Sequence, residues 1–265
     1  MPHVQGGRTH YQARLAVSPR RIRITVAYDG TDFHGWQVQP GLPTIQGCLE
    51  EIVSGIEEHP VHVAGSGRTD TGVHAKAQVA AFTLSNPIPV ENLQRAINRL
   101  LPPAIRILDV REARSEFHPR FDSIAKTYRY TLFRAPVCSP FDWRYMHHYP
   151  YPLNEEAMKA AAAFLVGEHD FTALAAADEK GTKAKSKVRT IFNSEVQREG
   201  DQLIYTVRGS GFLKHMVRNI VGTLIEAGRG NIDPSDILHR KGNTALAKGL
   251  TLMSVEYPPH DNLSE

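Results

Sequence analysis

The tripeptide Gly-Ser-Gly occurs twice in the chain, at residues 65–67 and 209–211, and each copy directly follows a strand-like run. Around each copy the hydrophobic periodicity predicts a similar order of elements, roughly strand, helix, strand, strand, helix, strand. Short strands mixed with amphipathic helices are typical of α+β proteins. The sequence therefore predicts two related α+β halves, each an antiparallel sheet with helices packed on one side.

Local signals place the elements of the first half. The Thr44 hydroxyl can cap a helix, and Pro102-Pro103 cannot continue one. The predicted elements are a strand over 21–28, a helix after Thr44, strands over 61–64 and 77–84, a helix over 91–101 and a strand over 105–110.

The second half repeats the pattern, with Asn154 and Asp233 as helix caps. Its predicted elements are a strand over 125–133, a helix from Asn154 to Gly167, strands over 189–197 and 202–208, helices over 212–227 and from Pro234, and a strand over 250–257. The predicted domains are a basic tail (1–20), an N-terminal α+β domain with the glycine loop (21–113), a C-terminal α+β domain (114–258) and a tail (259–265).

The composition is that of an ordinary globular protein. The 265 residues are 41% hydrophobic and 22% charged, with a net charge of +3. We see no apolar run long enough to span a membrane and no secretory signal. The two cysteines, Cys48 and Cys138, have no metal or redox spacing, so we expect a cytoplasmic protein.

The positive charges are clustered in two places. One cluster lies within residues 180–189 and the other within residues 8–23. Basic clusters on a nearly neutral chain are typical of phosphate-binding surfaces. The alternative is a solvated face or tail, and the sequence leaves both open.

The segment from Gly65 to Ala75 contains three glycines, Arg68, Asp70 and His74. It lacks the Gly-Lys-Ser/Thr of a P-loop, and Asp70 stands where a dinucleotide-binding fingerprint requires glycine. The triplet Asp70-Thr71-Gly72 also occurs in aspartic proteases, whose chemistry needs two carboxylates; a dimer could supply the second. The simplest alternative is a tight turn in which Asp70 caps local amides.

The predicted helix over 212–227 is apolar except on one side of its first turns. That side carries Lys214, His215, Arg218 and Asn219. It is either a solvated basic face or a site at which Arg218 pairs with a carboxylate, since a guanidinium stays charged and binds two oxygens at once.

Residues 117–121 and 126–130 interleave aromatic and cationic side chains. This mixture suits unpaired bases and phosphates, although a half-buried strand with a charged outer face has the same pattern. The pair His147-His148 has no carboxylate at a ligand spacing, so we expect no metal.

Taken together, these segments resemble the TruA family of tRNA pseudouridine synthases. The matching segments are residues 67–75, 117–121, 126–130, 212–222 and 249–252. The chain departs from the family at Asn243-Thr244-Ala245-Leu246-Ala247, where alanine and proline are usual. We expect this departure to lie away from the chemistry.

The resemblance implies two α+β halves around a continuous sheet, with the active site in a cleft between them. It implies a homodimer in which one tRNA contacts both subunits, with no cofactor, no metal and no membrane. The implied reaction converts uridine to pseudouridine at positions 38, 39 and 40 of the anticodon stem-loop. The main alternative is a non-catalytic RNA-binding module on the same scaffold.

The resemblance also assigns roles to individual residues. Asp70 is the catalytic carboxylate, which attacks C1′, adds to C6 of the base or takes a proton from C2′; the sequence leaves these routes open. Arg218 pairs with Asp70, Tyr128 stacks on the uracil and can assist removal of the C5 proton, and Arg68 fills the space left by the flipped nucleotide. The implied tRNA-backbone contacts are Phe117, His118, Pro119, Arg120, Phe121, Lys183, Lys185 and Lys187.

Overall fold

The computed structural model describes residues 18–177 and 186–261. The elements of the first half are β1 (Arg20–Tyr28), α1 (Ile45–Glu57), β2 (Ala64–Gly65), β3 (His74–Leu84), α2 (Val90–Leu100) and β4 (Ile105–Ala113). Those of the second half are β5 (Ala125–Phe133), β6 (His147–His148), α3 (Glu155–Ala163), β7 (Gly167–Asp170), β8 (Val188–Glu199), β9 (Gln202–Gly209), α4 (Met216–Gly228) and β10 (Leu250–Glu256).

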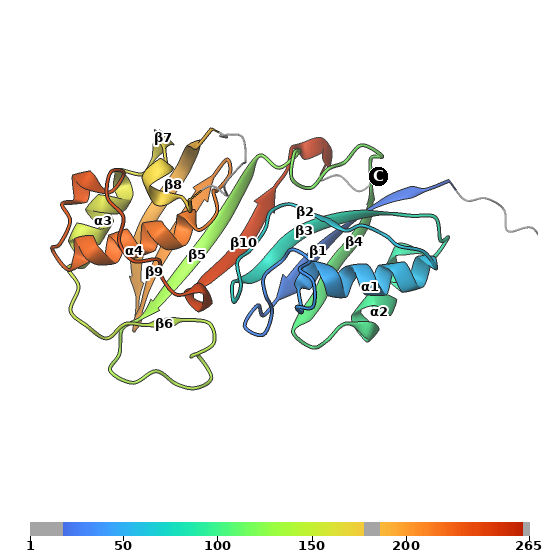
Figure 1. The fold of residues 1–265 in the computed structure, drawn as a ribbon, viewed down its shortest axis with the longest axis horizontal. Coiled ribbons are helices and arrows are strands. Elements are labelled where there is room, and N and C mark those ends of the chain that lie inside the picture. The colour runs from blue at the N-terminus through green and yellow to red at the C-terminus, as the bar shows by residue number, and fades with distance from the viewer. Residues whose placement is uncertain (1–17, 178–185, 262–265) are drawn as a thin grey trace, which may run out of the picture.

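The strands form one continuous sheet across both halves, as predicted. The main order is β4-β1-β3-β10-β5-β9-β8-β7, with β2 beside β3 and β6 beside β5. The pairs are antiparallel except β10 with β3 and β6 with β5. In Figure 1 the halves lie side by side, with β10 at the centre between β5 and β3.

Strand β10 joins the halves through a short register. Thr251 pairs with His74, and Leu252 pairs with Ala75 on one side and with Tyr128 on the other. The end of the glycine loop and the strand that carries Tyr128 are therefore one strand apart.

Within the described residues, helices α1 to α4 pack on the same side of the sheet, which confirms the predicted layering. One hydrophobic core contains Leu49 of α1, Leu93 of α2, Met158 of α3 and Ile220 of α4, together with alternate residues of the strands. Figure 1 shows α1 and α4 in front of the strands of their halves. Each fully buried aliphatic side chain of this kind stabilises the fold by about 1.5–3 kcal/mol.

The opposite face of the sheet carries a smaller cluster, formed by Val79, Ala81, Phe117 and Tyr257. The Arg23 guanidinium lies 4.4 Å from the centre of the Tyr257 ring and covers part of this cluster.

Two predicted helix caps are confirmed. The Thr44 hydroxyl accepts a hydrogen bond from the Gly47 amide at 3.2 Å, and the Asn154 side chain accepts one from the Ala157 amide at 3.0 Å. Such caps contribute about 1 kcal/mol each, because they satisfy amides that have no partner within the helix.

The predicted helix over 212–227 begins four residues later than expected, at Met216. His215 stands before it with φ 61, a left-handed conformation that cannot continue a helix N-terminally. Tertiary contacts hold the preceding residues: the Phe212 ring packs on Tyr128, and the Lys214 carbonyl accepts a hydrogen bond from the Ala176 amide at 3.0 Å.

Other boundaries also differ from prediction. The strand expected over 61–64 is reduced to β2, the helix after Asn154 ends at Ala163, and the missed strand β7 begins at Gly167. Pro234 starts only a single 3₁₀ turn, Pro234–Asp236. The division into domains at residues 113 and 114 stays a prediction, and most of the predicted basic tail lies outside the described residues.

Replacement of Gly222 in the middle of α4 should destabilise the fold. A Cβ at this position would lie 1.7 Å from the Asn243 carbonyl oxygen, so the segment that follows residue 242 would have to move away. We expect Gly222→Ala to lower the free energy of unfolding in urea by about 1–3 kcal/mol. The matched control is Gly55→Ala in α1, where nothing lies within 4 Å of the added Cβ and alanine favours the helix. Equal stability of the two variants would contradict the packing argument.

Candidate active site

The segment between β2 and β3, residues 66–73, is held by the chain that follows β1. The Trp36 amide donates to the Thr69 carbonyl at 3.1 Å, and the Gly72 amide donates to the Phe33 carbonyl at 3.3 Å. Gly35 has φ +83, and a Cβ there would lie 2.4 Å from the Thr69 oxygen. Only glycine allows this close approach, so residues 30–36 form a backbone support for the loop.

Buried polar side chains fix the loop from inside. The Ser66 hydroxyl donates to Gln78 Oε1 at 2.6 Å, and Gln78 Nε2 donates to the Gly67 carbonyl at 2.9 Å. The hydroxyls of Tyr28 and Thr69 are hydrogen-bonded at 2.8 Å. A loop with this many internal hydrogen bonds presents Asp70 in a defined orientation.

The predicted pairing of Arg218 with Asp70 is present. Arg218 Nη1 lies 3.0 Å from Asp70 Oδ2, and His215 Nε2 lies 3.6 Å from the same oxygen. The two side chains of the pair are partly exposed, 17% for Arg218 and 23% for Asp70. The described neighbours of the carboxylate are thus nitrogen groups rather than the second carboxylate that an aspartic protease requires.

The segment 243–247 touches Arg218, so the expectation that it lies away from the chemistry is wrong. Arg218 Nε donates to the Ala245 carbonyl at 2.8 Å, and the Ala245 amide donates to the Arg218 carbonyl at 3.1 Å. The Thr244 hydroxyl donates to Asn219 Oδ1 at 2.7 Å. This segment orients the guanidinium toward Asp70, a contact that spacing in the sequence could not indicate.

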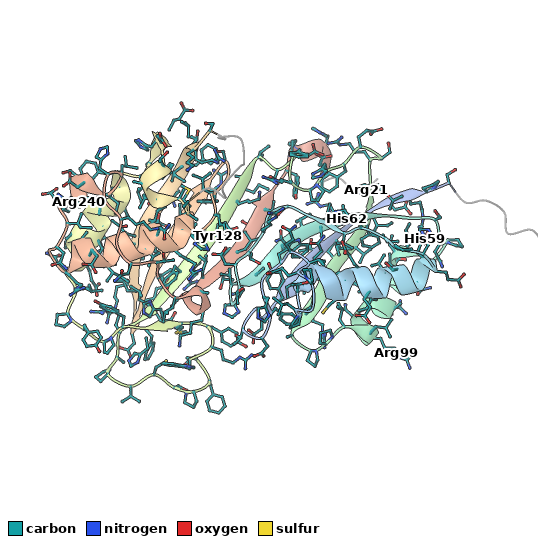
Figure 2. The ribbon with its side chains drawn as sticks, viewed as in Figure 1. Arg21, His59, His62, Arg99, Tyr128 and Arg240 are labelled. Carbon is teal, nitrogen blue, oxygen red and sulfur yellow. The ribbon has the colours of Figure 1, made fainter. Side chains whose placement is uncertain are left out.

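Tyr128 lies on β5, the strand of the second half that pairs with β10, and Figure 2 labels it there. Its side chain is 7% exposed, and its ring makes an edge contact with Phe212 at 5.1 Å between centres. Burial raises the pKa of Tyr128 above the usual 10, and the nearby Tyr28 and Asp70 raise it further. The phenol is therefore neutral at physiological pH and presents an aromatic surface rather than a phenolate.

Arg68 precedes Asp70 by two residues and has an exposed side chain. Within residues 18–177 and 186–261, its guanidinium has no hydrogen bond or ion pair. The geometry leaves this cation free to interact with a ligand.

The segment 117–121 forms a turn with a buried base and an exposed tip. Phe117 and Pro119 are buried, and the Pro119 carbonyl accepts a hydrogen bond from the Tyr257 hydroxyl at 2.7 Å. His118 Nδ1 accepts a hydrogen bond from the Arg120 amide at 3.1 Å, and this bond closes the turn. Arg120 and Phe121 are exposed, Phe121 by 76%, so the tip supplies the groups that could meet RNA.

The predicted lysine contacts are only partly described. Lys183 and Lys185 lie outside the described residues, whereas Lys187 lies directly before β8 with a partly exposed side chain. Their contact with tRNA stays a prediction.

A second connection between the halves runs through His74, which the sequence argument did not use. Its Nε2 is 3.1 Å from the Arg144 carbonyl oxygen, and its Nδ1 accepts a hydrogen bond from the Gly30 amide at 3.1 Å. Arg144 also forms ion pairs with Asp29 at 3.2 Å and Asp32 at 2.6 Å. Burial lowers the pKa of His74 despite the opposing effect of Asp29, so the neutral ring holds the 134–146 loop against the first half. The sequence could have indicated His74, because it lies in the segment that matches the family. No feature of the sequence indicated Arg144.

In the part of the chain that the structure describes, no group of three or more His, Cys, Asp or Glu side chains could hold a metal ion. Likewise, no described helix is long and apolar enough to cross a membrane. Of the adjacent histidines, His147 lies 2.9 Å from the Tyr130 hydroxyl through its Nδ1.

Comparison with known proteins agrees with this geometry. A family described as tRNA pseudouridine synthase matches residues 24–122 and 161–258. The chain is 67% identical over 239 residues to tRNA pseudouridine synthase A of Solibacter usitatus (strain Ellin6076), covering 90% of this chain and 100% of the relative. It is 44% identical over 246 residues to the protein of the same name from Brevibacillus brevis (strain 47 / JCM 6285 / NBRC 100599), covering 90% of this chain and 100% of that relative.

Optical titration should show that Tyr128 stays protonated in alkaline solution. Since burial raises its pKa, Tyr128→Phe should leave the phenolate absorbance gained between pH 8 and about pH 11 unchanged. A solution of N-acetyltyrosinamide, whose phenol titrates at about pH 10, calibrates the signal of one tyrosine. If Tyr128→Phe lost the absorbance of one such phenol, the neutral state would be refuted.

Proposed function

The chain belongs to the tRNA pseudouridine synthase family and is an isomerase of tRNA uridines; from this premise we propose that Asp70 is its catalytic carboxylate and that its targets are positions 38, 39 and 40 of the anticodon stem-loop. The observation that carries the proposal is the ion pair of Asp70 with Arg218 at 3.0 Å, which joins the loop of one half to a helix of the other.

The reaction determines what the site must provide. The N1–C1′ bond of uridine breaks, the uracil rotates, and a bond forms between C5 and C1′. The proton on C5 leaves and N1 gains one, so product and substrate are isomers. Water must be kept from C1′ while the base is detached, and the two halves around the site can exclude it.

Asp70 acts as an anion in each of the three routes, whether it attacks C1′, adds to C6 or removes the C2′ proton. The Arg218 guanidinium donates a hydrogen bond to one oxygen of this carboxylate at 3.0 Å. Arg218 is itself held at its Nε by the Ala245 carbonyl, so only its Nη1 side faces Asp70. This arrangement orients one carboxylate oxygen and leaves the other available to the substrate.

Tyr128 serves as the stacking surface for the uracil. A neutral phenol is a poor general base, so the geometry supports stacking more than removal of the C5 proton. Arg68, exposed and without an internal partner among the described residues, would fill the gap that the flipped nucleotide leaves.

The proposed partners are tRNA and a second copy of the chain. The exposed Arg120 and Phe121, with Lys187, would contact the tRNA backbone. A homodimer in which each tRNA touches both subunits follows from the family resemblance, and sedimentation with and without tRNA tests it. The cytoplasmic location rests on the two cysteines, which have no metal or redox spacing.

Replacement of Asp70 tests the catalytic assignment. Asp70→Asn and Asp70→Ala should reduce tritium release from C5-labelled uridine in tRNA by about 10⁴-fold or more, the scale expected for loss of an essential catalytic group. The control is Asp201→Asn, an exposed carboxylate in the turn between β8 and β9. Release by Asp70→Asn at the wild-type rate would disprove the role of Asp70, and absent turnover in the parent protein would support the RNA-binding module instead.

Replacement of Arg218 should separate catalysis from binding. Arg218→Ala should lower the single-turnover rate by about 10²- to 10³-fold, because the carboxylate loses its partner, while tRNA affinity changes little. Arg218→Lys should restore only part of the rate, since an ammonium cannot contact Asp70 and Ala245 as a planar guanidinium does. Arg240→Ala, at the far end of the second half in Figure 2, is the control. A large loss of affinity with an unchanged rate would make Arg218 a phosphate contact.

A further inference from the structure

Lys126 is a buried cation to which the described residues supply no anion. Its side chain belongs to a residue only 8% exposed, and within the described residues it forms no ion pair. Lysine is rarely buried to this extent unless it is paired, because removing an ammonium from water costs several kcal/mol. The burial of the Lys126 ammonium therefore requires an explanation, and Asp70 does not provide one because it pairs with Arg218.

The contacts of the ammonium are few. Its Nζ donates to the Ser66 carbonyl at 2.8 Å, and the other two N–H donors have no hydrogen-bond partner in residues 18–177 and 186–261. Its charged neighbour is Arg120, a group of like sign. Burial, with a smaller effect of Arg120, lowers the pKa of Lys126 to about 8, which reflects a cation that lacks a counter-charge.

The ammonium lies beside the proposed catalytic site. Lys126 is two residues before Tyr128 on β5, and side chains at this spacing share one face of a strand. On the loop side, a Cβ on Gly67 would be 3.7 Å from Nζ, so no side chain of residue 67 stands between the lysine and the space next to Arg68. Arg120, on the exposed tip of the 117–121 turn, is close enough to contribute to the lowered pKa of Lys126.

We propose that Lys126, assisted by the exposed Arg120, binds a backbone phosphate of the RNA next to the target nucleotide. This inference rests on the proposed function, since it assigns the phosphate to a tRNA substrate bound for isomerisation. A phosphodiester would supply a negative charge for the Lys126 ammonium. Its oxygens would accept hydrogen bonds from the two N–H groups of Nζ that the described residues leave without a partner. Arg68 would enter the gap in the RNA while Lys126 holds the backbone beside it, which fixes the flipped nucleotide over Tyr128.

A purely structural role predicts different behaviour. If Lys126 served only to hold the Ser66 carbonyl, its loss would loosen the glycine loop. The affinity for RNA would then fall equally, whether or not a linkage is neutral. If it binds a phosphate, its loss matters only when that phosphate is charged. A thermodynamic cycle between the lysine and a single phosphate distinguishes the two.

The experiment pairs Lys126→Met with RNA whose backbone is neutral at one place. Anticodon stem-loop RNAs carry a single methylphosphonate at each linkage flanking the target uridine in turn, and affinity is measured in Asp70→Asn protein with and without Lys126→Met. We expect one linkage at which neutralisation weakens binding about tenfold with lysine present and has little effect with methionine. For the unmodified RNA, the slope of the logarithm of the binding constant against the logarithm of the salt concentration should be smaller in magnitude by about 0.7–0.9 in the Lys126→Met variant.

Controls keep the test decisive. Lys126→Arg retains the charge and should retain the coupling, whereas Lys241→Met removes an exposed lysine and should leave every linkage effect intact. Thermal unfolding of each variant verifies that it is folded. Additive effects at all linkages would overturn the phosphate site. Pseudouridine formation by the wild-type protein, measured separately, tests the proposed function, so its failure is distinguishable from failure of the cycle.

Discussion

The ion pair between Asp70 and Arg218 is the interaction on which the site depends, because each partner comes from a different half of the chain. Asp70 is presented by a loop that residues 30–36 support, and Arg218 is oriented by the Ala245 carbonyl. Neither half alone can form the pair. The 3.0 Å contact therefore requires that the sheet be continuous and that both supports be in place.

The sequence predicts features whose causes are local. Thr44 and Asn154 cap helices because their own side chains reach amides three residues away. The alternation over residues 125–133 correctly places Tyr128 and Tyr130 on one buried face. For Arg218 the sequence pattern leaves a solvated basic face and a pairing with a carboxylate both open, and the family resemblance alone points to Asp70 as the partner.

Features set by distant contacts could not be predicted in this way. Helix α4 begins at Met216 because His215 turns the backbone and Phe212 packs on Tyr128, neither of which periodicity can reveal. The contact of Ala245 with Arg218 spans 27 positions, and the burial of Lys126 depends on a loop 60 residues earlier. In each case the side chain's own neighbours in sequence gave no information about its partner.

The insertion of β10 between β3 and β5 has a consequence for biosynthesis. Leu252 pairs with both Ala75 and Tyr128, yet β10 follows every other described strand in the chain. A ribosome makes the chain from its N-terminus, so the glycine loop and Tyr128 exist long before the strand that sets them side by side. The nascent protein thus carries the two parts of its proposed active site apart, and the arrangement of that site is the last feature of the fold to form.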